Sequence, residues 1–384
     1  MTHAAAPARR LLLVLTALVL GACAGTAPRE PEGLGPTAAR ALIARALPSH
    51  VQRDRDGWTA DIYAAFGSIG LPVTAESACA VIAVIDQEST FQVDPQVPGL
   101  STIAWREIEA RAARLGLPRA VVRTLLKAPS RDGRSYAQRI DTAKTERELS
   151  EIFEDLIGVL PGGETLFADR NPVRTGGPMQ VSIAYAESYA DDRSYPYPRE
   201  KGQSLRREVF TRRGGLYFGI AHLLDYPTAA YDRPLFRFAD FNAGHYASRN
   251  AAFQAAVSLL TGIPLAFDGD LLREGAPADA PGQTELATRA LSKRLGLDHD
   301  DIRDDLGQGR SVKFEKTRLY ERVFEHVDAA ERRPVPRAIV PSIRLVSPKI
   351  TRKLTTEWFA TRVQARHAGC LQRLGTPPPS TAKA

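Results

Sequence analysis

The carboxylate of Glu88 follows an unusually apolar run of the chain, CAVIAVIDQESTF. Residues at i, i+3, i+4 and i+7 predict an apolar stripe along one face of a helix: Ala78, Val81, Ile82 and Ile85. The same periodicity brings that stripe to Glu88. An acid held against apolar side chains is desolvated, so its pKa rises and it can donate a proton near neutral pH. The simpler alternative is a partly exposed residue in a last helical turn, because most helical Glu residues lie at the surface.

The start of this helix and the placement of its other acid follow from the same pattern. Pro72 stands just outside the helix, Thr74 can cap its N-terminus, and Glu76 lies in the first turn. Asp86, two positions before Glu88, lies roughly 160° around a helix with 3.6 residues per turn. We therefore expect Asp86 to be solvated while Glu88 faces the core.

Two later segments carry polar side chains at turns. In GGPMQVSIAYAESYA, the glycines let the backbone approach a ligand closely, and Gln180 offers both a donor and an acceptor. An ordinary loop leading into a helix is the alternative. We expect four residues to share one face of that helix: Val181, Ala184, Tyr185 and Ser188. In FADFNAGHYASR, Asn242 lies among aromatic residues near the end of a helix, which Gly244 can terminate. Its amide either forms hydrogen bonds to a sugar or caps the helix.

In this order, QESTF, GPMQV and FNAG resemble the signature motifs of lytic transglycosylases with a goose-type lysozyme-like fold. Those motifs are a Glu-Ser pair, a Gly-Leu-Met-Gln turn and an Ala-Tyr-Asn-Ala-Gly segment. The resemblance implies that Glu88 is the single catalytic acid and base, without a cofactor, and that peptidoglycan glycan strands are the substrate. It implies a saccharide cleft lined by the following residues: Ser89, Gly177, Met179, Gln180, Phe241, Asn242 and Tyr246. The implied products carry 1,6-anhydro ends, because the C6 hydroxyl of N-acetylmuramic acid replaces water.

The sequence departs from this family pattern in three ways. Pro178 replaces the usual Leu, and Phe241 replaces the usual Tyr, so a hydroxyl there must come from Tyr246 or Tyr217. The first two motifs are 92 residues apart, from Glu88 to Gln180, far more than is usual in the family. The spacing predicts a helical insertion at about 101–170. The whole chain also resembles an uncharacterised family of Gram-negative lipoproteins with this core.

Two other functions are compatible with the same residues. A muramidase that hydrolyses the bond with water needs a second carboxylate, for which the loose candidates are Asp94, Glu154, Glu164 and Asp169. A lipoprotein that keeps the cleft but only binds the wall is the other alternative, and the acid at the end of the apolar stripe argues against it. No metal-binding motif, serine-nucleophile elbow or phosphate loop is present in the sequence, and the seven His residues are scattered.

The N-terminus predicts export. Arg9 and Arg10 precede the apolar run LLLVLTALVL, which is shorter than the ~20 residues needed to span a bilayer. The following LGAC resembles a lipobox, which implies removal of residues 1–22 and lipidation, including palmitate, of Cys23. Ala24 favours the outer membrane by the same resemblance, at its periplasmic face. A plain secretory signal cut near Ala22 or Ala24 is the alternative.

The mature chain has 49 basic and 44 acidic residues, a net charge of +5 that suits a polyanionic wall, and an exported protein seldom meets nucleic acid. Cys79 and Cys370 remain as an even pair in an oxidising compartment. They form either a disulfide or two buried thiols, because sequence cannot show how close their backbones lie.

The elements that position these residues are predicted to be mainly α-helical. Helical periodicity dominates the chain and sustained strand alternation is nearly absent. We expect a flexible tether at 23–37, a lysozyme-like helical domain at 38–270 with the insertion, a charged helical C-terminal extension at 271–375, and a disordered tail at 376–384. The breakpoint at 271 follows from REGAPADAPGQ, after which the chain is highly charged. Protein partners cannot be named from the sequence.

Overall fold

The computed structural model describes residues 34–199, 203–228, 231, 233–273, 275, 277, 279–346 and 352–376. The predicted signal peptide, Cys23 and residues 23–33 of the predicted tether lie outside these residues, as does the tail from 377 onward. The described chain is mainly α-helical, as predicted, with two short antiparallel strand pairs. Its buried apolar side chains form three clusters.

The central cluster gathers helices from both ends of the chain. Its elements before residue 200 are α2 (Pro36–Ala46), α3 (Arg55–Ile69), α4 (Ala75–Glu88), β1 (Thr175–Gly176), β2 (Val181–Ser182) and α10 (Ile183–Asp192). Its later elements are α11 (Leu205–Val209), α12 (Arg212–Leu224), α13 (Pro234–Ala243) and α19 (Thr356–Leu374). This cluster contains all the motif segments singled out from the sequence.

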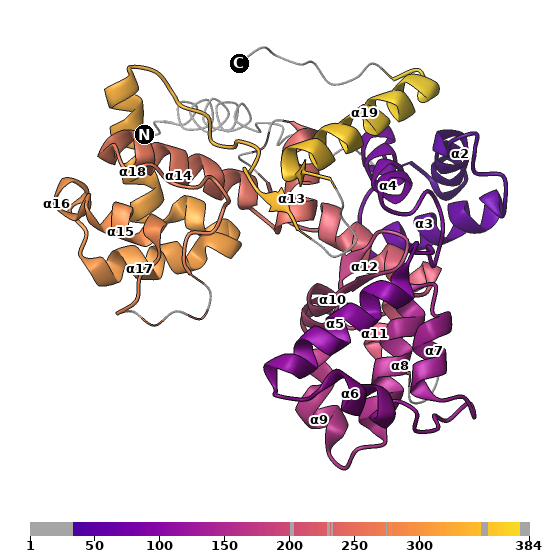
Figure 1. The fold of residues 1–384 in the computed structure, drawn as a ribbon. Coiled ribbons are helices and arrows are strands. Elements are labelled where there is room, and N and C mark those ends of the chain that lie inside the picture. The colour runs from indigo at the N-terminus through magenta and orange to yellow at the C-terminus, as the bar shows by residue number, and fades with distance from the viewer. Residues whose placement is uncertain are drawn as a thin grey trace, which may run out of the picture.

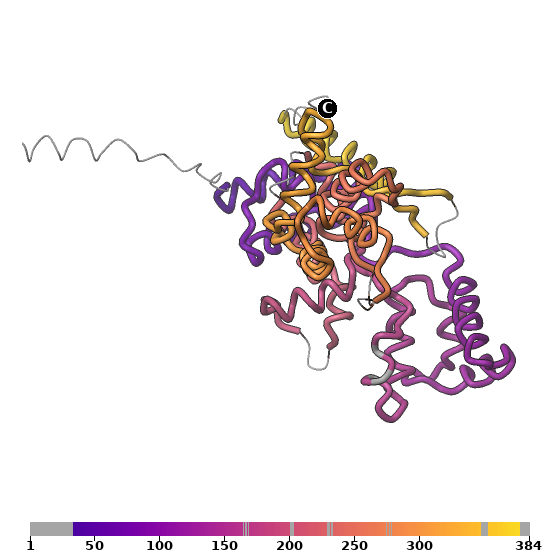
Figure 2. The backbone as a smooth tube through the Cα atoms, turned by 90° about the vertical axis from the view of Figure 1, so that its left-hand side faces the viewer, coloured from indigo at the N-terminus to yellow at the C-terminus, as the bar shows by residue number. Residues whose placement is uncertain are grey.

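The segment between α4 and β1 forms a lobe with a small hydrophobic core of its own. Its elements are α5 (Leu100–Arg114), α6 (Arg119–Leu125), α7 (Tyr136–Thr142), α8 (Glu146–Gly158), α9 (Gly163–Phe167) and the 3₁₀ turn η1 (Ala168–Arg170). The lobe extends away from the central cluster in both views (Figures 1 and 2). Leu149 of α8 packs against both cores and so joins the lobe to the central cluster.

The C-terminal cluster forms around the buried face of α14 (Ala247–Thr261). Its further elements are α15 (Gln283–Arg289), α16 (Ser292–Leu295), α17 (His299–Gly307), the 3₁₀ turns η2 (Gln308–Arg310) and η3 (Val312–Lys316), and α18 (Arg318–Glu331). The guanidinium of Arg249 is fully buried and donates to the carbonyl oxygens of Gly309 (2.5 Å) and Ser311 (3.0 Å). These bonds join α14 to η2 and η3.

The last helix returns to the central cluster. After β3 (Arg344–Leu345) and β4 (Leu354–Thr355), α19 packs against α4, α13 and α2 (Figure 1). The segment predicted as one extension, 271–375, is therefore divided: α15 to α18 belong to the C-terminal cluster, whereas α19 belongs to the central one. Sequence could not show this division, because α19 shares the charged character of α17 and α18 but packs on helices about 280 residues earlier.

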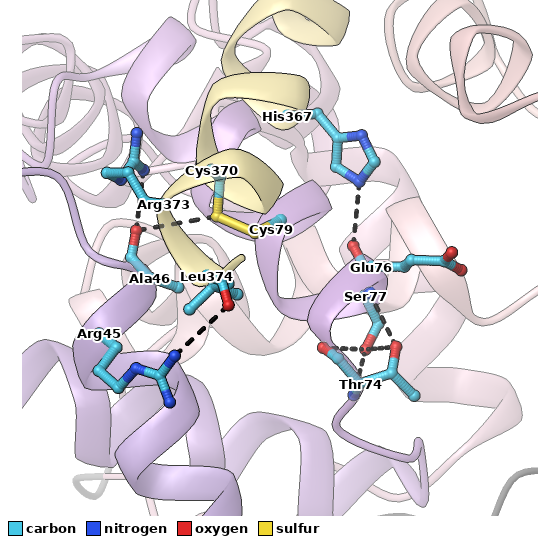
Figure 3. Close-up of a disulfide and its surroundings, with 10 residues drawn as sticks. All are labelled: Arg45, Ala46, Thr74, Glu76, Ser77, Cys79, His367, Cys370, Arg373 and Leu374. Atoms are coloured by element: carbon cyan, nitrogen blue, oxygen red, sulfur yellow. Dashed lines mark hydrogen bonds between the residues drawn. A yellow bond between two sulfur atoms is a disulfide. The ribbon is translucent and has the colours of Figure 1, made fainter. Parts of the chain in front are cut away.

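A disulfide fixes α19 onto α4 (Figure 3). Cys79 and Cys370 form this bond with their Cα atoms 5.5 Å apart, so of the two alternatives the structure has the disulfide. Near it, Arg373 donates to the carbonyl oxygen of Ala46 (2.9 Å), and His367 Nε2 donates to that of Glu76 (3.3 Å). The C-terminal helix thus supports the helix that ends at Glu88.

None of the helices in the described part of the chain is both long enough and apolar enough to cross a membrane.

Candidate functional site

Glu88 is the last residue of α4, and its side chain is half-buried. The predicted cap is confirmed: Thr74 Oγ1 accepts from the backbone N–H of Ser77 (3.1 Å), and Ser77 Oγ accepts from that of Thr74 (2.9 Å). The four residues of the predicted stripe are each at most 1% exposed: Ala78, Val81, Ile82 and Ile85. The residues between them are buried as well, so burial in α4 is not confined to one face. Glu88 itself does not face the core as expected: it is the partly exposed residue of a last turn, the simpler alternative, at the end of an otherwise buried helix.

Ser89 fixes the backbone beside Glu88. It is the C-cap of α4 and is buried, and its hydroxyl donates to the carbonyl oxygen of Ile85 (3.1 Å). The backbone N–H of Ser89 donates to the same carbonyl oxygen (3.0 Å), so Ser89 holds the last turn of α4 through two hydrogen bonds. In this arrangement Ser89 shapes the helix end on which Glu88 lies.

The expectation that Asp86 is solvated is wrong. Its side chain is only 16% exposed, with Oδ1 2.9 Å from His50 Nε2 and Oδ2 accepting from Arg366 Nε (3.0 Å). Periodicity could not show that the side of α4 that carries Asp86 is also covered, by His50 after α2 and by Arg366 on α19. Asp86 is an ion-paired anchor for α4.

The second motif forms the turn of a hairpin. Thr175 pairs with Ser182 and Gly176 with Val181, so residues 177–180 connect β1 to β2. Gly177 has a φ of +71°, and a Cβ there would lie 2.3 Å from the carbonyl oxygen of Val209, so only glycine fits.

The side chains of this turn point in different directions. Met179 is fully buried. Gln180 is half-buried and closes the turn: its Nε2 donates to the carbonyl oxygen of Gly177 (3.2 Å), and its Oε1 accepts from Thr175 Oγ1 (3.2 Å). Gly177, Pro178 and Met179 are buried, so Gln180 is the partly exposed residue of the turn.

The helix after the hairpin has a different face from the one expected. Val181 belongs to β2, and α10 begins at Ile183. Its buried residues are Ile183 and Ala186, whereas Ala184 and Ser188 are exposed. The predicted face is wrong because Val181 lies in a strand and not in the helix, and α10 buries Ile183 and Ala186 instead. Tyr185 is half-buried and lies against His222, with ring centroids 4.4 Å apart.

The third motif ends α13. Phe241 is buried, and Asn242 is half-buried with its Oδ1 accepting from Thr356 Oγ1 at the start of α19 (2.9 Å). Gly244 stops the helix with a φ of +104°. Tyr246, one proposed source of the hydroxyl missing from Phe241, is 4% exposed with its ring under the Arg249 guanidinium. The other, Tyr217, is 2% exposed inside a group of aromatic rings.

Asp240, which the sequence did not single out, organises the chain around the third motif. Its carboxylate is fully buried and accepts from the backbone N–H groups of Tyr246 (2.9 Å) and Ser248 (2.7 Å) and from the Tyr231 hydroxyl. Burial raises the pKa of Asp240 to about 6, and these hydrogen bonds oppose that rise. The available signal was a charged residue between Ala239 and Phe241 in an otherwise apolar helix turn.

The central helix α12 is the shared support of all three motif segments, because α4, β2 and α13 all contact it. His222 Nε2 donates to the carbonyl oxygen of Phe241 (3.2 Å), and His245 Nε2 donates to that of His222 (2.7 Å). Both rings accordingly carry the proton on Nε2. Burial, together with His245 beside it, lowers the pKa of His222 to about 3.

Glycines on α12 let the second motif come close. A Cβ at Gly219 would lie 2.6 Å from Met179 Cβ, and one at Gly215 would lie 2.5 Å from the Pro178 side chain. The turn of the second motif therefore rests directly on the backbone of α12.

Of the loose candidates for a second carboxylate, two are ion-paired. Asp94 pairs with Arg147 (3.0 Å), and burial raises its pKa. Glu154 pairs with Arg207 (2.7 Å) and accepts from Ser204 Oγ. Asp169 is exposed in η1, and the Glu164 side chain lies outside the described part of the structure. No group of three His, Cys, Asp or Glu side chains among the described residues is placed to hold a metal ion.

Two depressions lie elsewhere, in the C-terminal cluster. The larger, about 500 Å³, is bordered by Leu265, Asp268, Arg273 and Gln283, and the other, about 290 Å³, by Asn250, Leu306 and Gly309. Both are separate from the motif residues.

Comparison with known proteins gives a family. Residues 51–373 match the model of a family described as "Protein of unknown function (DUF1615)". The chain belongs to the DUF1615 family. It is similar to the "Uncharacterized protein YaiW" of Escherichia coli (strain K12), with 50% identity over 364 residues, which cover 94% of this chain and 98% of that protein. No solved structure matches the chain.

The DUF1615 match begins before α3 and ends within α19. It therefore includes the lobe, the C-terminal cluster and the helix that carries Cys370. In this family the lobe and the C-terminal helices are parts of the common unit, and the three motifs lie well inside it.

Proposed function

We propose that this DUF1615 protein is a peptidoglycan lytic transglycosylase with Glu88 as its single catalytic acid and base. The observation that carries the proposal is the common support of the three motif segments. The end of a buried helix, a hairpin turn and the end of a second helix each belong to an element that contacts α12. One acid on a rigid, buried support is what single-carboxylate chemistry requires.

In the proposed reaction, Glu88 protonates the oxygen between N-acetylmuramic acid and N-acetylglucosamine. The acetamido group of the substrate stabilises C1 as the bond breaks. The Glu88 carboxylate then takes the proton of the C6 hydroxyl, whose oxygen bonds to C1 and closes the 1,6-anhydro ring. The proton lost in the first step is recovered in the second, and no water is consumed. A well-placed acid and base contributes roughly 10²- to 10⁴-fold of rate.

The neighbouring residues have positioning roles in this proposal. Ser89 holds the helix end through Ile85, and Gln180 is fixed within its turn by Gly177 and Thr175. Asn242 is oriented by Thr356, whose hydroxyl donates to its Oδ1. These bonds restrict side-chain motion, so less entropy is lost when a saccharide binds.

A digestion of purified wall sacculi tests the proposal. The mature protein is expected to release muropeptides with anhydro ends, and Glu88→Gln is expected to release none, because an amide cannot donate the required proton. Glu76→Gln is the matched control: it makes the same change on the same helix, at an exposed position in the first turn. Reducing ends would indicate a hydrolase. Binding of sacculi without any release would indicate a wall-binding protein, and either result would overturn the proposal.

We also propose that the protein is exported and anchored by a lipid on Cys23 at the periplasmic face of the outer membrane. The support is the lipobox resemblance of LGAC. Cells labelled with radioactive palmitate are expected to label the wild-type protein and not Cys23→Ser. Equal labelling of both proteins, or of neither, would contradict this anchor.

A further inference from the structure

The outer end of the lobe exposes an unusual share of apolar surface. Seven of the twelve large apolar side chains exposed among the described residues lie in it: Leu115, Leu117, Val121, Leu125, Val159, Leu160 and Phe167. Single exposed apolar residues are normal on any protein, but a gathering of them marks a surface that contacts something.

Four of these residues lie on the turn from α5 to α6 and on α6 itself, which we call the α5–α6 face: Leu115, Leu117, Val121 and Leu125. Leu115 is 79% exposed and Leu125 is 63% exposed. Val121 and Leu125 are four residues apart, so they lie on one side of α6. Val122 and Leu126 are buried in the lobe core. The short helix α6 therefore has two apolar sides, and only one of them is used within the protein.

The same segment is strongly basic. Residues 110–135 contain seven Lys and Arg residues and one acid, Asp132. Arg119 and Arg123 both pair with Glu109 on α5 (2.8 Å each), and Arg134 pairs with Asp132. Four exposed cations have no ion-pair partner among the described residues: Arg111, which donates to the carbonyl oxygen of Arg170 (3.3 Å), and Arg114, Lys127 and Arg131. They flank the apolar side chains along the chain.

The position of this face suits an extended flat partner. The lobe projects from the central cluster, and α6 lies at its far end in Figure 1, while Figure 2 shows the lobe protruding from the side. Exposed leucines and valines beside unpaired cations are the composition of segments that lie in the interface of an anionic bilayer.

We propose that the α5–α6 face docks on the surface of an anionic lipid bilayer. The leucines and valines enter the boundary between headgroups and acyl chains, and Arg114, Lys127 and Arg131 lie against the phosphates. Such contact is weak for one short segment, so it acts together with a second attachment to the membrane. This inference does not depend on glycan cleavage, and it places the lobe, rather than the central cluster, against the lipid.

Vesicle co-sedimentation tests the docking. The protein used is a chain that begins at Ala24, which contains every described element, with its folding checked by circular dichroism. It is expected to bind vesicles that contain phosphatidylglycerol, to lose binding as salt is added, and to bind pure phosphatidylcholine at least about tenfold more weakly. Failure to bind phosphatidylglycerol vesicles would overturn the proposal.

Matched variants locate the contact. Leu115→Ser/Leu125→Ser and Arg114→Gln/Lys127→Gln are each expected to weaken binding by about tenfold or more, since both kinds of side chain contribute. Leu259→Ser/Leu286→Ser and Lys293→Gln/Arg294→Gln make the same changes at exposed positions of the C-terminal cluster and are expected to bind like the wild type. Equal effects of lobe and control variants would contradict the proposal.

Self-association is the competing use of this face. If sedimentation velocity showed a dimer that Leu115→Ser/Leu125→Ser dissociates, while no vesicles were bound, the face would be an interface between two copies and the lipid proposal would fail. Glu88→Gln is expected to bind vesicles like the wild type, so failure of the proposed enzymatic function leaves this test unaffected.

Discussion

Asp240 is a charged group that the fold removes from water, and its surroundings explain why it is tolerated. Two backbone N–H groups and a tyrosine hydroxyl donate to it, and together they fix the chain between α13 and α14. Its folded-state pKa of about 6 lies above the ordinary value of 3.8, so the native state binds this proton more tightly than the unfolded chain does.

Because the native state binds this proton more tightly, Asp240 makes the free energy of unfolding fall as the pH rises. The contribution of Asp240 to the free energy of unfolding is fully present below pH 3.8 and is lost as the pH rises to about 6. From pH 4 to pH 6 the wild type should therefore lose about 2 kcal/mol relative to Asp240→Asn, which has no such proton. Urea unfolding at several pH values measures the difference. Asp304→Asn, an exposed change, is the control.

The comparison with the variant is needed because His222 acts in the opposite direction. Burial lowers its pKa to about 3, so its contribution to stability is lost as the pH falls from 6.5 toward 3. A wild-type curve alone would contain both effects. A constant difference between wild type and Asp240→Asn across this range would contradict the account of Asp240.

At the scale of single residues, the sequence predicted correctly those contacts that form between neighbours in one helix. The cap at Thr74 is such a contact, and it is as expected. Asp86 was misjudged because its partner Arg366 comes from an element far along the chain. Asp240 was missed because its partners, although within nine residues, are brought to it by the turns on either side of α13, which periodicity does not describe. Periodicity identifies the side of a helix, but not what covers it.

Among the elements, α12 is the one on which the proposed site depends, and its glycines give a direct test. Gly219→Ala would place a Cβ 2.6 Å from Met179, so we expect destabilisation of about 1–3 kcal/mol through overpacking. Gly67→Ala, inside α3 with open space around it, should instead stabilise by about 0.5–1 kcal/mol. Denaturant unfolding measures both values, and the same sign for both would contradict the close approach of the second motif to α12.

The disulfide between α4 and α19 gives a second test at this scale. Cys79→Ala/Cys370→Ala should lower the free energy of unfolding by about 2–5 kcal/mol, because the bond constrains a loop of 291 residues in the unfolded chain. The measurement is thermal unfolding with and without reductant. Reductant should lower the midpoint of the wild type and leave the double variant unchanged. An equal response of both proteins would show that the bond is not formed.

Elements with strong helical periodicity were predicted well, and the elements between them were not. The helix predicted to carry Glu88 is α4, and the predicted insertion at about 101–170 is helical, with α5 to α9 and η1. The β1–β2 hairpin was missed because its strands have two residues each and show no alternation. The error in the face of α10 follows from the same omission.

At the scale of the whole molecule, the buried apolar side chains form three clusters with different roles. The central cluster holds the motif segments, and the lobe presents the α5–α6 face. In the C-terminal cluster the buried Arg249 joins α14 to η2. The mainly helical class followed from sequence, but the return of α19 to the central cluster did not, because no local pattern encodes contact between residues 79 and 370.

The central claim is single-carboxylate cleavage without water, and digestion of sacculi in ¹⁸O-labelled water tests it most directly. The account predicts that the wild type and Glu76→Gln release muropeptides with 1,6-anhydro ends that carry no ¹⁸O, and that Glu88→Gln releases none. Release of muropeptides with ¹⁸O at a reducing end, or undiminished release by Glu88→Gln, would contradict it.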